Sequence, residues 1–349
     1  AGTWQYNSNG TYASETWANG TTNTELATIA EAMEGAVVGY SIANGAYLQN
    51  FSVAGQETNP RGLAFNADGS KMFVAGSAGG DVNEYTLSTN FDVSTASFVD
   101  SFSVSAQESN LLSLAFSTDG TKMYIVGNSA DTVFEYTLST GFDVSTASYT
   151  QGFSVATQDD NPRGLAFNTD GTKMFVAGYT GQDINEYALS TGFNVSTASF
   201  VDSFSVSAQD TSPCGVAFNA DGTKMFVVGQ TGVDVNEYAL STGFDVSTAS
   251  FVSVFSISAQ ETVPFDIAFN ANGAKMFIVG QTGDAVYEYS TVSSYTNQMD
   301  KTQLDAVTDP NHIALGNDFD LSIILNMTSG TTVPSSNGVA INYDANILN

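Results

Sequence analysis

One dodecapeptide recurs along the chain at a constant spacing. The segment FNADGTKMFVVG at 218–229 has close copies at 65–76, 116–127, 167–178 and 269–280. Successive copies begin 51 residues apart, with no insertion or deletion between them. Internal repetition at about 40–50 residues with strand-like content is typical of β-propellers, in which each repeat forms one blade. The spacing therefore predicts a ring of equivalent blades.

A single repeat divides into four strands. The unit that begins at Gly62 predicts strands at 62–66, 71–76, 81–88 and 97–105. The first two flank an Asp-Gly pair, a strong hairpin signal because glycine accepts positive φ without steric cost. The second strand carries consecutive apolar residues (Met-Phe-Val) where a half-exposed strand would alternate. Such a strand is expected where a blade lies between two neighbours.

Counting strands predicts how the ring closes. Residues 46–57 align with a fourth strand one period earlier, and the last copy ends after its third strand at Tyr289. The total is twenty strands, which makes an all-β, five-bladed propeller whose N-terminal strand completes the last blade and leaves no open end. The segment VVGYSI at 37–42 resembles the third strand VNEYTL. As a twenty-first strand it would favour six blades, the main alternative.

The two ends of the chain leave the repeat. Residues 1–36 contain Trp4, Trp17 and a predicted short helix whose capping box pairs Thr22 with Glu25. Residues 37–292 form the predicted propeller. Residues 293–349 predict strands at 320–327 and 338–345, as a β segment that is an incomplete domain or an assembly contact. An isolated hairpin is marginal in water. Both ends are therefore expected to contact the propeller or other proteins.

Charge excludes several classes of partner. The net charge of −28 disfavours nucleic acid and anionic membranes. No apolar stretch approaches the ~18 residues of a membrane span. Cys214 is the only cysteine, so there is no intrachain disulfide. The NADG-type turns resemble fragments of calcium loops without the later acidic positions. No cofactor is expected, and calcium is left as an alternative.

Candidate catalytic residues are scarce. The strands that would line the centre read GLAFN, SLAFS, GLAFN, GVAFN and DIAFN, with Asp266 as their one acid. The only histidine, His312, lies outside the repeats. The sequence has no evident nucleophile–base pair, metal-ligand motif or phosphate loop. We therefore expect a protein that is not an enzyme.

Two charged positions recur once per repeat. A lysine begins each second strand and a glutamate lies on each third strand, which predicts a Lys–Glu contact between the strands of every blade. Such a pair has a structural role and, if partly exposed, contributes about 0–1 kcal/mol. These residues are Lys71 and Glu84, Lys122 and Glu135, Lys173 and Glu186, Lys224 and Glu237, and Lys275 and Glu288.

The copies diverge on one face only. The connections between blades (NPRG, NLLS, NPRG, SPCG, VPFD) and between second and third strands (SAGGD, NSADT, YTGQD, QTGVD, QTGDA) vary, while the other two turns barely change. In a propeller these variable loops share a face, called here the loop face. Loops on a rigid scaffold usually carry recognition, although drift in tolerant loops is the alternative. The predicted binding residues are Arg61, Leu111, Leu112, Arg163, Tyr179, Cys214, Phe265 and Asp266.

The repeat resembles a propeller family of bacterial surface proteins and marine phage virion proteins. FNADGTKMFVVG, NEYALSTGFDVSTASF and SFSVSAQ carry this resemblance over roughly 46–290. More distantly, AFNADGTKMFV is similar to YVTN-type and lactonase-like propeller repeats. The C-terminal HIALGNDFDLSIILNMTSGTTVPSSNGVAINYDA looks like segments of phage structural proteins.

The resemblance implies a virion appendage, such as a fibre, decoration or tail-associated protein, or else a secreted adhesin. The place is then a virion surface or the extracellular space. A glycan or host receptor would bind the loop face, and other virion or surface proteins would bind the arm and tail. A lactonase-like hydrolase with a metal in the central funnel, and a purely architectural subunit, are the alternatives.

Overall fold

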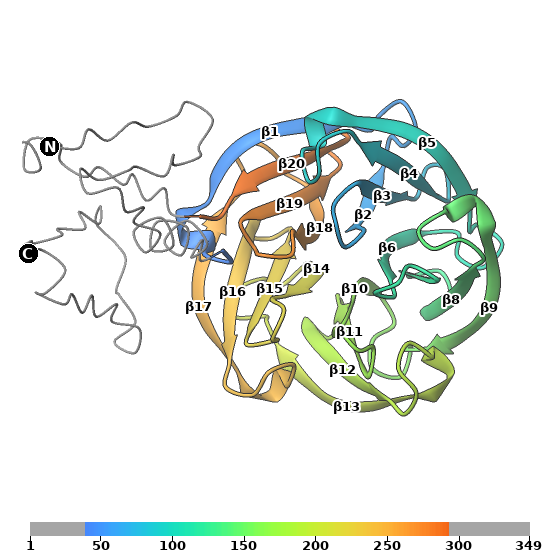
Figure 1. Ribbon diagram of the computed structural model, residues 1–349. Coiled ribbons are helices and arrows are strands. Elements are labelled where there is room, and N and C mark those ends of the chain that lie inside the picture. The colour runs from blue at the N-terminus through green and yellow to red at the C-terminus, as the bar shows by residue number, and fades with distance from the viewer. Residues whose placement is uncertain (1–38, 293–349) are drawn as a thin grey trace, which may run out of the picture. The chain divides into compact units, whose positions relative to one another are not determined.

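A computed structural model describes residues 39–292 of the chain. These residues form five four-stranded antiparallel sheets around a central axis (Figure 1). The predicted N-terminal arm with its helix and tryptophans, the C-terminal β segment and His312 lie outside the described residues. No helix of the described part is long and apolar enough to cross a membrane.

Each repeat forms one blade, numbered from the axis outward. Blade 1 contains β2 (Pro60–Phe65), β3 (Lys71–Gly76), β4 (Asp81–Leu87) and β5 (Ala96–Ser103); blade 2 contains β6 (Leu111–Phe116), β7 (Lys122–Gly127), β8 (Thr132–Leu138) and β9 (Ala147–Ser154); blade 3 contains β10 (Pro162–Phe167), β11 (Lys173–Gly178), β12 (Asp183–Leu189) and β13 (Ala198–Ser205); blade 4 contains β14 (Pro213–Phe218), β15 (Lys224–Gly229), β16 (Asp234–Leu240) and β17 (Ala249–Ser256); blade 5 contains β18 (Pro264–Phe269), β19 (Lys275–Gly280) and β20 (Ala285–Ser290), with β1 (Ala46–Ser52) outermost.

The N-terminal strand closes the ring, as predicted. β1 pairs antiparallel with β20, from Ala46 opposite Ser290 to Ser52 opposite Ala285. Blade 5 is therefore built from both ends of the described chain, and the five-bladed fold is confirmed. Pairing β1 onto β20 satisfies a strand edge that a linear array would expose.

The sixth-blade alternative is wrong. Within the described part of VVGYSI, residues 39–42 do not extend a sheet, and a 3₁₀ helix, η1 (Ile42–Asn44), follows Tyr40. The equivalent helices η2 (Val93–Thr95), η3 (Val144–Thr146), η4 (Val195–Thr197) and η5 (Val246–Thr248) lead into the outer strands of the other blades. Tyr40 takes the place of Phe91, one period later, with φ values of 60° and 55°. The segment therefore matches the connection before the fourth strand.

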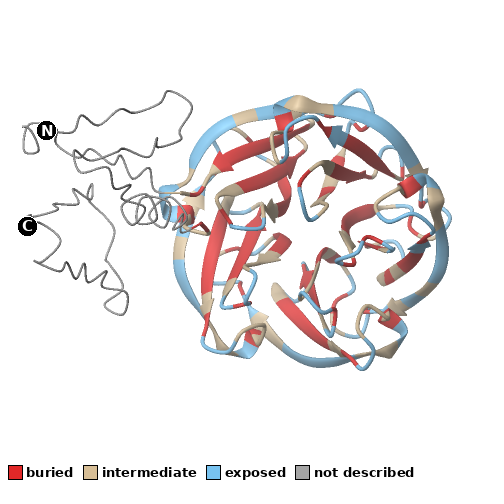
Figure 2. Cartoon of the chain, in the orientation of Figure 1, coloured by how far each residue is buried: buried red, intermediate tan, exposed pale blue. Residues whose placement is uncertain are grey.

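The core lies at the seams between blades. Five clusters of buried side chains each combine residues of two adjacent blades; one joins Phe73 and Val82 of blade 1 to Leu114 and Ile125 of blade 2. This arrangement explains why the second strands are apolar on both faces. The inner strands are buried and the outer strands are largely exposed (Figure 2).

The repeated Asp-Gly turn joins the first and second strands of each blade. In blade 4, Gly222 has φ +71° and its N–H donates to Asn219 O, while Asp221 Oδ1 accepts from Thr223 N. A Cβ at Gly222 would fall inside van der Waals distance of the Phe244 ring. Glycine is thus required here both by the left-handed backbone and by the aromatic side chain packed against it.

Candidate functional site

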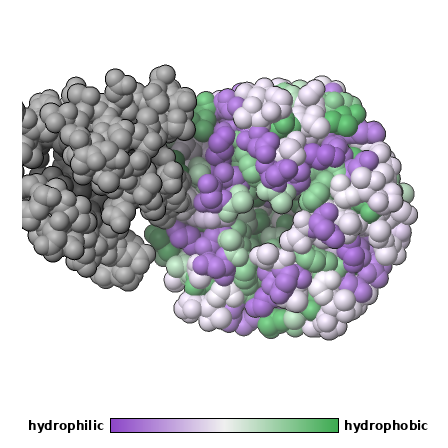
Figure 3. All heavy atoms as spheres, in the orientation of Figure 1, coloured by the Kyte–Doolittle hydropathy of each residue, from purple (hydrophilic) through white to green (hydrophobic). Residues whose placement is uncertain are grey.

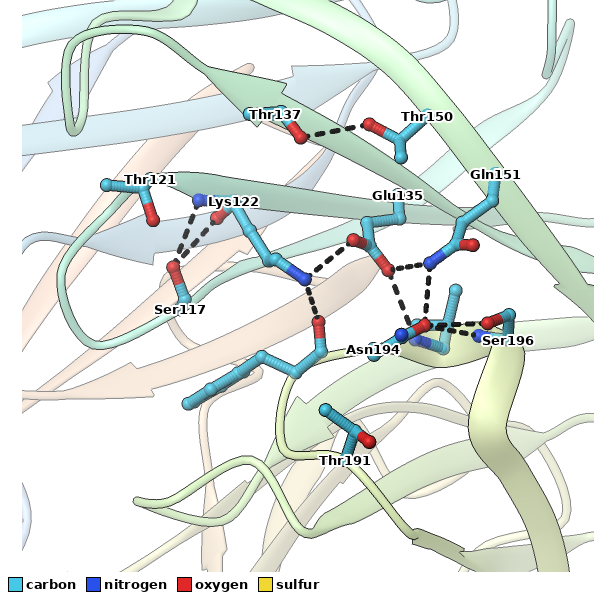
Figure 4. Close-up of polar contacts among 12 residues, drawn as sticks. Ser117, Thr121, Lys122, Glu135, Thr137, Thr150, Gln151, Thr191, Asn194 and Ser196 are labelled. Atoms are coloured by element: carbon cyan, nitrogen blue, oxygen red, sulfur yellow. Dashed lines mark hydrogen bonds and ion pairs between the residues drawn. The ribbon is translucent and has the colours of Figure 1, made fainter.

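The recurring lysines and glutamates connect adjacent blades as well as adjacent strands. Lys122 Nζ lies 2.8 Å from Glu135 Oε1 and also donates to Phe193 O of blade 3 at 2.6 Å. Glu135 Oε2 accepts from Val195 N, the first residue of η4, at 3.1 Å (Figure 4). Each pair therefore binds the backbone of the next blade. The Lys–Glu pair is a clamp across the seam between two blades.

The same ion pair recurs at every seam. The Nζ–Oε1 distances are 2.6–2.8 Å, and the glutamates are almost fully buried while the lysines are about a third exposed: Lys71–Glu84, Lys122–Glu135, Lys173–Glu186, Lys224–Glu237 and Lys275–Glu288. At the closing seam, Lys224 Nζ donates to Tyr40 O, and Glu237 accepts from Ser253 Oγ as its second partner. The repeated charges thus have a structural role.

A second set of carboxylates, missed by the sequence reasoning, shapes the loop face. Glu108 is fully buried and accepts from Asn110 N at 2.7 Å, Ser129 N at 3.2 Å and Ala130 N at 3.2 Å. The equivalent residues are Glu57, Asp159, Asp210 and Glu261, each bonded to backbone N–H groups of the same two loops. Their signal was available, because an acid follows Ala-Gln or Thr-Gln, or Gly-Gln at 55–57, once in every 51 residues.

These carboxylates make the loop face rigid. Each one joins the connection that enters a blade to the loop between the second and third strands of that blade. Both variable loops are therefore fixed at their bases by charge-assisted hydrogen bonds, which are shorter and stronger than neutral ones. The loop residues that differ between blades are thus presented on a repeated and well-supported frame.

The axis of the ring is tightly packed. The residues at the third position of the five inner strands are Gly62, Ser113, Gly164, Gly215 and Asp266. A Cβ at Gly164 would overlap Cys214 O, and one at Gly215 would crowd the Asp266 carboxylate. Asp266 spans the axis, since it accepts from Leu63 N of blade 1 at 3.2 Å and from Ser113 Oγ of blade 2 at 2.9 Å. Burial raises the pKa of Asp266 to about 7.

The preceding position of each inner strand forms a second layer nearer the loop face. We call it the mouth ring, and it consists of Arg61, Leu112, Arg163, Cys214 and Phe265. The Arg61 guanidinium carbon lies 3.7 Å from the Phe265 ring centroid, and that of Arg163 lies 3.8 Å from the Tyr179 centroid. Arg163 Nη1 also contacts Ser212 Oγ, Cys214 Sγ and Gln230 Oε1 at 3.3–3.5 Å.

The structure thus brings together most of the residues predicted on the binding face. Tyr179 joins the mouth ring through Arg163, and its side chain is 37% exposed. Cys214 is fully buried, and burial raises the pKa of its thiol to about 11, so it is neither a nucleophile nor a contact residue. Figure 3 shows apolar residues around the hollow at the centre of the ring.

Two of the predicted face residues lie elsewhere. Leu111 is fully buried in the cluster between blades 1 and 2, so its assignment to the binding face is wrong. It stands where the other inner strands begin with proline, and the register shift that follows turns it into the seam. Asp266 lies in the axial layer, with its carboxylate engaged by the protein's own donors.

Metal ligation was also considered across the described residues. Between residues 39 and 292, no three His, Cys, Asp or Glu side chains gather as ligands of a metal ion. The chemistry available at the mouth is therefore that of two guanidinium groups, two aromatic rings and neutral polar atoms.

Comparison with protein families assigns the chain. A family model described as lactonase, 7-bladed beta-propeller, matches residues 21–313, which include all five blades. The chain belongs to this family. It departs from the description in blade number, since closure by β1 leaves five blades in this lactonase-family propeller. A search of curated proteins finds no match.

Solved structures resemble this lactonase-family propeller at low identity. A functionally unknown protein from Desulfotomaculum acetoxidans is 17% identical, with 68% of this chain and 72% of that chain covered and a TM-score of 0.44. The periplasmic gluconolactonase of Pseudomonas aeruginosa is 18% identical, with 66% of each chain covered and a TM-score of 0.40. The hydrazine synthase of Kuenenia stuttgartiensis is 17% identical, with coverage of 67% and 58% and a TM-score of 0.42. These likenesses are too distant to bear on function.

Proposed function

We propose that the chain is a non-enzymatic recognition module that binds protein or glycan through the loop face. The observation that carries the proposal is the contrast between frame and loops. Five buried carboxylates hold the loops at equivalent positions, whereas the loop residues differ from blade to blade. Rigid scaffolds that present divergent loops are a common basis of recognition.

A lactonase-like hydrolase is the second candidate, and the family membership favours it. A hydrolase needs a general base within hydrogen-bond reach of its substrate. At the mouth, the Cys214 thiol is protonated and buried, and the Asp266 carboxylate is enclosed by Leu63, Ser113 and Ile267. The candidate predicts lactone hydrolysis by the purified chain, with or without added divalent metal. Turnover that Asp266→Asn abolishes would establish it.

The finer proposal is a virion appendage, with a secreted adhesin as its alternative. It rests on the resemblance of the repeats and of the C-terminal segment to such proteins. On this proposal the chain acts at a virion surface or outside the cell, and the arm and tail bind neighbouring surface proteins. Immunolabelling of the native particle or cell would place the protein directly, and labelling confined to the cell interior would refute this proposal.

Exchange of loops between blades tests the recognition function. Replacing NSADT (128–132) by QTGVD from 230–234 changes one loop of the loop face with a sequence that already fits the frame. The matched control replaces STDGT (117–121) by NADGT from 219–223, a turn at the other end of the strands. Binding to a glycan array or to host cells should change only in the first variant. Equal binding by both variants and the parent would refute a role for this loop.

A further inference from the structure

The two arginines are the exceptional cations of the described structure. Lys301 lies outside the described residues, and each of the other five lysines has a carboxylate partner. Among residues 39–292, Arg61 and Arg163 are the basic side chains without a carboxylate within 4.0 Å. Both belong to the mouth ring, in a chain whose net charge is −28. An excess of acids makes two neighbouring unpaired guanidinium groups all the more notable.

Their immediate contacts leave donors unused. Arg61 stacks on Phe265, and its Nε is buried without a hydrogen-bond partner in the described structure. Arg163 stacks on Tyr179 and contacts neutral acceptors at long distances of 3.3–3.5 Å through one nitrogen. A guanidinium presents five donors in a planar fork. Most of these donors are therefore available to a ligand.

The nearest acids are already occupied. Glu57 and Asp210 lie close enough to influence the pKa values of mouth-ring side chains, but their oxygens accept from backbone N–H groups of the loops. The two guanidinium groups also act on each other, because burial and the charge of Arg163 both lower the pKa of Arg61. An anion bound between them would relieve the like-charge repulsion and satisfy the unused donors.

We propose that the mouth ring binds an oxyanion, a carboxylate, sulfate or phosphate group of a small ligand, through Arg61 and Arg163. The aromatic rings of Phe265 and Tyr179 hold the guanidinium planes in place, and Leu112 offers an apolar neighbour for the rest of the ligand. The inference rests on the proposed recognition function and specifies the charged group that the loop face accepts. Planar forks match oxyanions bidentately, which favours arginine over lysine for this task.

Isothermal titration of the full chain tests the site. The probes are sodium glucuronate, inorganic sulfate and inorganic phosphate, with glucose as the neutral control; their relative affinities identify the type of oxyanion. At least one anion should bind saturably at one per chain, and glucose should not. Loss of one charge-assisted contact corresponds to a decrease of roughly 10–100-fold in affinity for Arg61→Met and for Arg163→Met. Leu112→Ala should change it by less than about threefold.

The outcomes separate this inference from the proposed function. Absence of saturable binding for all three anions, or binding that neither arginine substitution weakens in variants with parental thermal unfolding, overturns the oxyanion site. If the exchange of residues 128–132 still alters glycan or cell binding, the recognition function survives that failure. If an anion binds as expected while loop exchange has no effect, the oxyanion site stands and the role of that loop fails.

Discussion

Replacing Glu135 by leucine should destabilise the ring more than the same change at Glu237. Both glutamates are almost fully buried and pair with a lysine that also donates to a carbonyl of the next blade. They differ in their other partners. Glu135 accepts from the buried Val195 N–H and from Gln151, whereas Glu237 accepts from the Ser253 hydroxyl. The pair of variants therefore isolates one buried backbone donor.

The magnitude follows from which groups can return to water. Lys122 and Lys224 are 29% and 34% exposed, so loss of either ion pair costs about 0–1 kcal/mol. The partly exposed Gln151 and Ser253 can also be rehydrated. The Val195 N–H cannot, and a buried donor without an acceptor costs about 1–3 kcal/mol. Glu135→Leu should therefore lower the free energy of unfolding by about 1–3 kcal/mol more than Glu237→Leu.

Urea unfolding followed by far-ultraviolet circular dichroism measures this difference. The comparison requires equal m values, so that the shift in midpoint reports stability alone. Equal destabilisation by the two variants, or a larger effect at Glu237, would refute the claim that the glutamate secures the next blade through a backbone donor.

Three further predictions follow from other parts of the ring. Gly222→Ala should lower the free energy of unfolding by about 1–2 kcal/mol or more, because φ is +71° and the Phe244 ring blocks a Cβ, while Gly55→Ala, with open space around it, should change stability by less than about 0.5 kcal/mol; equal urea midpoints would contradict this. The pKa of Asp266, raised to about 7 from roughly 4 in an unfolded chain, favours the fold when the carboxyl is neutral, so this benefit is full below about pH 4 and is lost as pH rises through 7. The stability of the parent relative to Asp266→Asn should accordingly fall between pH 5 and 8, and a flat difference in unfolding free energy would be inconsistent with the buried acid. Removal of residues 1–52 should expose the β20 edge and cause self-association in light scattering, whereas removal of residues 1–38 should leave the ring closed; identical masses for both would count against closure by β1.

Much of the fold could be predicted because the repeat has a constant period. Equal spacing of the dodecapeptide implies equal blades, and the leftover strand at 46–52 then has one place to pair. The error at 37–42 came from local similarity of letters. The alignment by period places Tyr40 opposite Phe91, and the structure shows the same backbone conformation at both. Period was therefore a better guide than resemblance over six residues.

The candidate site was predicted less completely. Divergent loops identified Arg61 and Arg163, but not that their guanidinium groups stack on Phe265 and Tyr179. The carboxylates that support the loops were missed because they do not vary, and variation was the criterion used. Leu111 was misplaced because a register shift at the start of β6, invisible in the sequence, turns it into the seam.

By itself, the sequence determined the number of blades, the order of their strands and the existence of the repeated Lys–Glu pairs, because periodicity and hydrophobic pattern act along the chain. Only the tertiary structure decided what those pairs join and what lies at the centre. Closure brings side chains from all five blades to one axis, where space is so limited that glycine, serine and Asp266 fill it. The mouth ring of Arg61, Arg163 and Phe265 arises for the same reason, since residues about 51 or more positions apart become neighbours only when the ring closes.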